Sequence, residues 1–384
     1  MTTPQKPGWL RLLIKLIVFI FLCLLCQNIF GAIFVLGWTY RLMRRRSIFI
    51  FSSISDNSNN NDQCLSHPNL FKKEKNDDYF EEGAKSFFRN IKMGLLALVN
   101  TSFMLAPGFI LWMYAWYAGW QISFNKSYEY SSVGALLGVL GVILFSLAML
   151  YVPMAQARFA FTQQWKTFYQ FRVNMILISQ QVKSYALFAL LILFFAVFTN
   201  LFKTLPMFFS GMNLGIEDMS DEQLLAFMKN YFFVGTFIVM PLFFIIKRFM
   251  AKLFAKALIL SVQRELLSQK DLSELEWKIL NKFNLTEVDK EASSGLIWSL
   301  IKKNTSRVFK AQMLLLTFLL WTAFCFQIFV SEFLNYHNNE GWVNQPLIQL
   351  PYFKYIPNHL TEPEEHDQLV TPPKEMSDAH PILK

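Results

Sequence analysis

The chain contains six long apolar runs, which are separated by polar segments. The runs cover approximately residues 16–38, 93–120, 133–152, 185–202, 230–246 and 312–332. They contain no Asp, Lys, Arg or His, and the only Glu among them is Glu332, at the end of the last run. A helix needs about 20 apolar residues to cross the hydrocarbon core of a bilayer. The pattern therefore predicts an all-α, polytopic integral membrane protein with about six transmembrane helices. Pro107 is expected to kink the second helix, and Pro153 to close the third.

The polar segments divide the chain into four parts. We expect an N-terminal transmembrane helix in 1–40, a polar and partly disordered loop in 41–92, a membrane domain in 93–335 with a cytoplasmic helical segment in 247–311, and a Pro-rich acidic tail, largely disordered, in 336–384. The loop includes a low-complexity stretch, SSISDNSNNNDQ, whose single apolar residue, Ile54, cannot build a core.

The cytoplasmic segment predicts a small helical hairpin over residues 268–308. Ser273 with Glu276, and Thr286 with Asp289, fit the Ser/Thr-x-x-acid pattern that starts a helix. Each of the two predicted helices also has an apolar face. We expect this hairpin to be the docking surface for a soluble protein partner.

The distribution of Lys and Arg predicts how the chain is oriented. Three loops hold 27 of the 36 basic residues, and they all fall on the same side of the six predicted spans. These loops are 39–92, 153–184 and 247–311. The positive-inside rule places them in the cytoplasm and both termini outside it. The N-terminus is the exception to this pattern, because the orientation also translocates Lys6, Arg11 and Lys15.

The composition agrees with membrane residence. Hydrophobic residues make up 54% of the chain and charged residues only 16%, against about 25% in soluble proteins. The net charge of +9 comes from residues beside the apolar runs. Anionic lipid headgroups are therefore the expected partner, rather than nucleic acid.

One cytoplasmic stretch combines arginines with aromatic residues. Arg158, Phe161, Trp165, Phe168 and Arg172 recur at alternating three- and four-residue steps, which places them on one face of a helix. Two arginines that bracket aromatic rings predict an interfacial helix with its guanidinium groups on lipid phosphate. Packing against neighbouring helices is the alternative.

A second basic pattern follows the fifth span. Arg248, Lys252 and Lys256 recur every four residues, so they form a stripe along one side of a continuing helix. We expect this stripe to contact anionic headgroups, with each charge contributing about 1 kcal/mol near the surface. The alternative is an ordinary topology anchor without a specific lipid contact.

Two further patterns concern helix faces. Small residues on the third span indicate close helix packing, first within the chain and alternatively in a dimer. These are Gly134, Gly138 and Gly141. Indole side chains at four-residue steps on the second span predict either packing on another helix or a groove. These are Trp112, Trp116 and Trp120.

The search for chemistry finds no catalytic, cofactor-binding or metal-ligating set. The five His residues lie in loops or the tail, without metal-ligand spacing. Nucleophile-elbow, zinc-protease and phosphate-loop motifs are absent from the sequence. Cys23 and Cys26 form a CxxC pair within an apolar run, a setting that leaves thiols unreactive. We therefore expect a protein that is not an enzyme and has no cofactor.

The stretch LYVPMAQARFAFTQQWKTFYQFR at 150–172 carries a family resemblance. Over about residues 90–260 the chain resembles an uncharacterised family of bacterial multi-span membrane proteins, a domain of unknown function. The resemblance implies the bacterial inner (plasma) membrane and supplies no catalytic residues. The favoured function is a non-enzymatic scaffold or accessory subunit. The alternative is a channel or transporter for a neutral or amphipathic solute.

Overall fold

The computed structural model describes residues 8–55, 79–116, 131–209, 219–286, 296–333 and 350–352. Every regular element in these ranges is a helix, which confirms the all-α class. The longer helices are α1 (Gly8–Leu25), α2 (Ile29–Ile54), α4 (Tyr79–Trp116), α6 (Ser131–Thr162), α9 (Val182–Thr204), α10 (Asp221–Gln263) and α12 (Leu296–Phe333). The shorter ones are α7 (Trp165–Phe168), α8 (Phe171–Gln180), η4 (Leu205–Phe208), η6 (Gln269–Asp271) and α11 (Glu274–Lys282).

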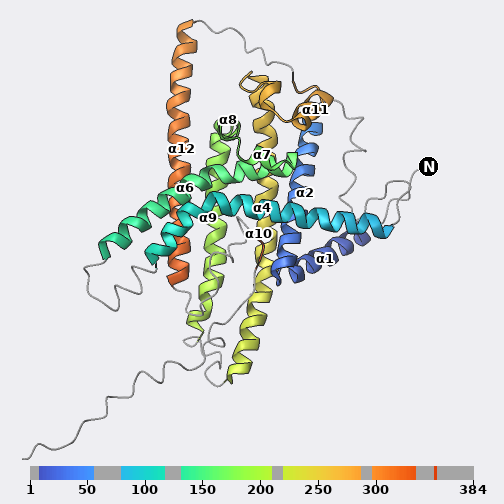
Figure 1. The fold of residues 1–384 in the computed structure, drawn as a ribbon, viewed down its shortest axis with the longest axis vertical. Coiled ribbons are helices and arrows are strands. Elements are labelled where there is room, and N and C mark those ends of the chain that lie inside the picture. Colours follow the sequence, from blue (N-terminus) through green and yellow to red (C-terminus); the bar gives the residue numbers. More distant parts are fainter. Residues whose placement is uncertain are drawn as a thin grey trace, which may run out of the picture.

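Within the described ranges, five helices are long and apolar enough to cross a membrane. The segments that qualify are Ser86–Trp112 in α4, Leu136–Thr162 in α6, Val182–Thr204 in α9, Glu222–Gln263 in α10 and Arg307–Gln327 in α12. These are the last five of the six predicted spans. In Figure 1, α9, α10 and α12 run along the long axis of the view, whereas α4 and α6 run across it.

The first predicted span, 16–38, is wrong as a single helix. Helix α1 ends at Leu25 and α2 begins at Ile29, and the two diverge like the arms of a V (Figure 1). The side chain of Asn28 caps α2 by accepting a hydrogen bond from the backbone N–H of Phe30 at 2.9 Å. A short polar side chain that binds nearby backbone competes with helix continuation. That competition gives a physical reason for the break inside an apolar run.

Helix α6 continues through Pro153 to Thr162, so the expectation that this proline closes the third span is also wrong. A proline inside a helix removes one backbone donor and leaves a carbonyl group without its usual partner. Close to this point, the Tyr185 hydroxyl of α9 donates a hydrogen bond to the Leu150 carbonyl at 2.8 Å. Neighbouring helices thus support the backbone of α6 as it passes the proline.

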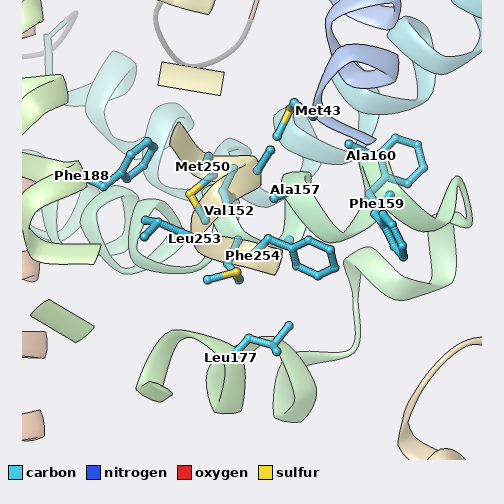
Figure 2. Packing of buried hydrophobic residues seen from close by; sticks show 14 of the residues in the cluster. Met43, Val152, Ala157, Phe159, Ala160, Leu177, Phe188, Met250, Leu253 and Phe254 are labelled. Atoms are coloured by element: carbon cyan, nitrogen blue, oxygen red, sulfur yellow. The ribbon is translucent and has the colours of Figure 1, made fainter. Parts of the chain in front are cut away.

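The extended end of α6 forms the centre of the core. All residues from 149 to 162 are buried. Figure 2 shows Val152, Ala157 and Phe159 of this stretch near Met250 and Phe254 of α10, and the side chains of other helices close the core around them. Large apolar side chains stay exposed on the outer surfaces of the long helices, as expected for surfaces that face lipid.

The predicted cytoplasmic hairpin is only half correct. Helix α11 forms where expected, and its capping box of Ser273 and Glu276 is present. The second helix is not separate, because α12 is continuous from Leu296 through the last span (Figure 1). The expected 41–92 loop is wrong at both ends, because α2 continues to Ile54 and α4 begins at Tyr79. The middle of that loop (56–78), the proposed cap residue Asp289 and nearly all of the 336–384 tail lie outside the described residues.

Candidate functional site

A fully buried ion pair joins α6 to α11. The Arg158 Nε donates to Glu276 Oε1 at 2.8 Å, and Nη2 donates to Oε2 at 3.1 Å. Both side chains are 0% exposed. This paired arrangement matches the planar guanidinium to the carboxylate and is among the stronger hydrogen-bonding geometries in proteins. It fixes α11 against the buried end of α6.

The same carboxylate also starts helix α11. The Ser273 backbone N–H and hydroxyl donate to Glu276 Oε2 at 2.8 and 2.9 Å. In return, the Glu276 N–H donates to Ser273 Oγ at 3.3 Å. The Glu276 side chain therefore performs a local capping function and a long-range pairing function at once. A buried charge is tolerated when its hydrogen-bonding capacity is used in this way.

The turn before α11 is attached to the same end of the bundle. Asp271 Oδ2 accepts hydrogen bonds from the Ser268 N–H at 3.0 Å and the Ser268 hydroxyl at 2.8 Å. These two bonds, followed by the weaker attraction of Arg172 and Arg158, lower the pKa of the Asp271 carboxyl. The nearest approach of Arg172 Nη1 to Asp271 Oδ1 is 3.8 Å. Residues 264–286, hereafter the 264–286 segment, are thus fixed at several points.

A second buried cation lies in α10. Lys247 Nζ donates to Gln156 Oε1 at 2.7 Å, and Gln156 Nε2 donates to Thr101 Oγ1 at 2.8 Å. The ammonium group also lies 5.8 Å from the centre of the Tyr40 ring and 5.5 Å from that of Phe243. Hydrogen bonds and cation–π contacts together connect α2, α4, α6 and α10 through polar groups in their buried interior.

Further polar contacts shape the turn after α6. Gln163 adopts a left-handed conformation with φ of 59°, which ends the helix. The Tyr151 hydroxyl donates to the Phe168 carbonyl, and Asn174 Nδ2 donates to the Tyr151 hydroxyl at 2.7 Å. Asn174 also donates to the Thr167 carbonyl at 3.2 Å. These bonds hold α7 and α8 against α6.

These contacts correct the predicted interfacial helix. Because α6 ends at Thr162, the five residues from Arg158 to Arg172 do not share one helix face. Arg158, Phe161 and Phe168 are buried, so Arg158 does not reach lipid phosphate. Trp165 is 55% exposed, and the Arg172 side chain is 79% exposed. Packing, the alternative interpretation, is therefore correct for the buried three.

The predicted basic stripe on α10 is accessible. Arg248, Lys252 and Lys256 are all exposed on this helix, so their headgroup contact stays a prediction. The four-residue periodicity leaves out the adjacent Lys247, which faces the interior instead. Lys247 lies one position before Arg248, so its side chain points about 100° away from the stripe around the helix. That offset is a usable sequence signal, since the neighbours Phe243 and Met250 are apolar.

The glycine pattern corresponds to close packing between α4 and α6. A Cβ atom built on Gly141 would lie 2.8 Å from the backbone N of Trp112. A Cβ on Gly138 would lie 3.3 Å from the Ala115 side chain, which is a milder contact. Gly134 lies in α6, but its surroundings fall outside the described part of the chain. Intramolecular packing therefore accounts for the two described glycines.

The tryptophan pattern is described only at its first member. Trp112 is partly buried against the main core, with its ring 6.5 Å from that of Phe109. The Trp116 side chain and all of Trp120 lie outside the described residues. Trp112 is therefore placed by packing where α4 meets α6, and a groove along the three residues stays a prediction.

The two cysteines of the CxxC pair also lie in a packed environment. Cys23 and Cys26 are buried in a small cluster around the turn between α1 and α2. Cys26 Sγ lies 3.7 Å from Met240 Sδ of α10. Among the described residues, no group of three or more His, Cys, Asp or Glu is arranged to hold a metal ion.

Comparisons with known proteins give no indication of the function of this chain. No family model, curated protein or solved structure matches the chain. The resemblance of residues 150–172 to an uncharacterised bacterial membrane-protein family accordingly stays a prediction. Function must be argued from the arrangement of particular residues, because a helical fold alone is compatible with many activities.

Proposed function

We propose that this protein is a non-enzymatic membrane scaffold or accessory subunit, which holds the 264–286 segment rigid for a soluble partner. The observation that carries the proposal is the buried ion pair between Arg158 and Glu276. It connects a polar segment outside the long helices directly to the centre of the core. A segment fixed in this way presents a constant surface, which is what a docking platform requires.

The two faces of α11 support this function. The inner face contributes Glu276 and Leu280, which are both fully buried. The outer face carries Glu274, Lys278 and Lys282, which are exposed. Truncating one member of a buried ion pair is strongly destabilising, whereas exposed charges contribute little to stability. The outer charges of α11 are therefore free to determine which partner binds.

A photocrosslinking experiment in native membranes tests the proposal. A photoreactive amino acid replaces Lys278 or Glu274, and the matched control replaces Leu190, an exposed apolar residue of α9. We expect the same discrete protein adduct from both α11 positions, no such adduct from Leu190, and loss of the adduct when Glu276→Ala is added. Membranes that yield no discrete adduct from either α11 position would contradict the scaffold function.

A channel or transporter for a neutral or amphipathic solute is the second candidate. The Lys247–Gln156–Thr101 network favours it, because polar groups from several helices meet there in the buried interior. Proteoliposomes should then show solute flux that falls in Thr101→Val. The control is Thr317→Val, a buried threonine whose hydroxyl donates within its own helix to Met313. Equal flux in both variants would exclude this network as the path.

We also propose a revised orientation in the bacterial inner membrane, in which α1 and α2 enter and leave on the cytoplasmic side. Gln27 Nε2 donates to Thr236 Oγ1 at 2.7 Å, and Cys26 contacts Met240. The turn between the two helices therefore lies beside the apolar middle of α10. Irregular backbone is acceptable at such a depth when protein surrounds it.

This orientation explains the basic N-terminus. Lys6, Arg11 and Lys15 join the cytoplasmic side, where 27 of the 36 basic residues already lie, and the exception to the positive-inside pattern disappears. The five remaining helices cross the membrane, which leaves the C-terminal tail outside the cytoplasm. The 264–286 segment then faces the cytoplasm.

A further inference from the structure

Four arginines gather where α2 crosses α4. Arg41, Arg44 and Arg45 of α2 are partly buried, and Arg89 of α4 is exposed. We refer to them as the arginine cluster. Arg41 Nη1 fixes one edge of the cluster by donating to Ser86 Oγ and Asn90 Oδ1, each at 2.9 Å. Both of these acceptors are neutral, so the bonds orient the guanidinium group without compensating its charge.

The cluster has no counter-ion among the residues that the structure describes. The two ion pairs in those ranges involve Arg158 and Arg172, and none of the four cluster arginines has a carboxylate partner. The Arg44 Nε atom is buried and makes no hydrogen bond there. Partial burial, followed by the charges of Arg89 and Arg44, lowers the pKa of the Arg41 guanidinium. The positive charges are therefore close enough to repel one another.

We propose that the arginine cluster binds the phosphate of an anionic phospholipid headgroup between α2 and α4. A guanidinium group presents several donors in a fixed plane and matches phosphate oxygens better than an ammonium group does. A phosphate placed there supplies the missing negative charge and an acceptor for the Arg44 Nε. It also converts the mutual repulsion of the arginines into a shared attraction.

The surroundings of the cluster favour a lipid over free phosphate. Phe87 and Phe88, beside Arg89 on α4, are 49% and 67% exposed. The Phe87 ring stacks on Phe34 of α2 with 5.2 Å between ring centres, so the apolar surface extends across both helices. Exposed aromatic rings next to a basic site provide a surface for acyl chains. Free phosphate would gain nothing from them.

The site differs from the basic stripe on α10. Arg248, Lys252 and Lys256 are exposed along one helix, as expected for a diffuse attraction to a charged surface. The arginine cluster combines two helices, partial burial and an unused buried donor. We therefore expect selective retention of an anionic headgroup at the cluster.

The test measures thermal unfolding of the full chain in detergent during titration with phosphatidylglycerol, phosphatidylcholine or inorganic phosphate. A ligand that binds only the folded state raises the unfolding temperature with its concentration. The cluster variant combines Arg44→Gln, Arg45→Gln and Arg89→Gln. A matched control removes the same charge from exposed residues near α11, and it combines Lys270→Gln, Lys278→Gln and Lys282→Gln.

We expect phosphatidylglycerol alone to stabilise the native protein. The cluster variant should need at least about tenfold more of this lipid for half the shift, since the loss of one charge-assisted hydrogen bond suffices for such a change. The control should respond like the native protein. If the triple variant does not fold, the single variant Arg89→Gln replaces it, because it keeps the three partly buried arginines of α2. This single variant should also lower the response to phosphatidylglycerol.

Three results would overturn the proposal. If phosphatidylglycerol raised the unfolding temperature of the cluster variant as much as that of the native protein, the arginine cluster would not be the binding site. An equal loss in the control variant would indicate non-specific charge attraction. Inorganic phosphate acting as well as phosphatidylglycerol would identify a free-phosphate site without a lipid component.

Discussion

Glu276 supplies hydrogen-bond acceptors to two helices with a single carboxylate. Oε1 accepts from Arg158, and Oε2 accepts from Arg158 and from two groups of Ser273. Because these donors surround a residue that is 0% exposed, water cannot replace any of them. The Glu276 carboxylate stabilises the structure because it accepts all of these hydrogen bonds at the same time. Shortening the side chain would leave the buried Arg158 guanidinium without its charge partner.

We predict that Glu276→Ala lowers the free energy of unfolding by about 3–5 kcal/mol, the range found when one member of a buried ion pair is removed. Chemical unfolding in detergent measures this change. The control is Glu274→Ala, an exposed glutamate two positions away, which should change the value by less than about 0.5 kcal/mol. Replacing both partners, as Arg158→Met with Glu276→Leu, should restore most of the loss. If Glu276→Ala and Glu274→Ala lowered the free energy of unfolding equally, the result would contradict a structural ion pair.

Helices α2 and α4 approach each other at two glycines. A Cβ on Gly37 would clash with the Asn90 carbonyl oxygen, and a Cβ on Gly94 would clash with the Ile33 carbonyl oxygen. Backbone atoms cannot rotate away as a flexible side chain can, so both helices would have to separate. The crossing also positions the arginine cluster, which links this packing directly to the proposed lipid site.

We predict that Gly37→Ala and Gly94→Ala each destabilise the protein by at least about 2 kcal/mol, as expected for overpacking against backbone. Gly138→Ala is the matched control, because its new methyl group would meet only the Ala115 side chain at 3.3 Å. The better helix propensity of Ala should offset that mild contact. Unfolding temperatures in one detergent compare the three variants. If Gly138→Ala lowered the unfolding temperature as much as Gly37→Ala and Gly94→Ala do, close packing between α2 and α4 would not explain the loss of stability.

Several elements could be predicted from the sequence because their causes are local. Long apolar runs predicted the helical class and the five helices that are long and apolar enough to cross a membrane. The Ser273–Glu276 spacing predicted the start of α11. Other features depend on residues distant in the chain. The passage of α6 beyond Pro153 is accompanied by a hydrogen bond from Tyr185, and the burial of Arg158 needs Glu276, 118 positions away. Periodicity alone placed Arg158 at the surface because it carries no information about that partner.

At the scale of the whole molecule, the charged residues form two kinds of site. Arg158 and Lys247 are buried and bind polar groups of neighbouring helices, whereas the arginine cluster and the α10 stripe keep part of their surface exposed. The apolar runs 133–152 and 230–246 end before Arg158 and Lys247. The helices themselves extend further and carry charge into the core. The proposed docking surface on the 264–286 segment and the proposed lipid site at the arginine cluster both depend on how the molecule is oriented in the membrane.

Cysteine labelling in intact cells tests that arrangement most directly. Single cysteines replace Lys6, Ser294 or Gln368 in a Cys64→Ser background, with a membrane-impermeant maleimide as the probe; the three remaining cysteines are buried. We predict that Lys6→Cys and Ser294→Cys react only after the cells are permeabilised, whereas Gln368→Cys reacts in intact cells. Reaction of Lys6→Cys in intact cells would contradict the turn of α1 and α2 within the membrane. Reaction of Ser294→Cys would contradict a cytoplasmic 264–286 segment and, with it, the scaffold function.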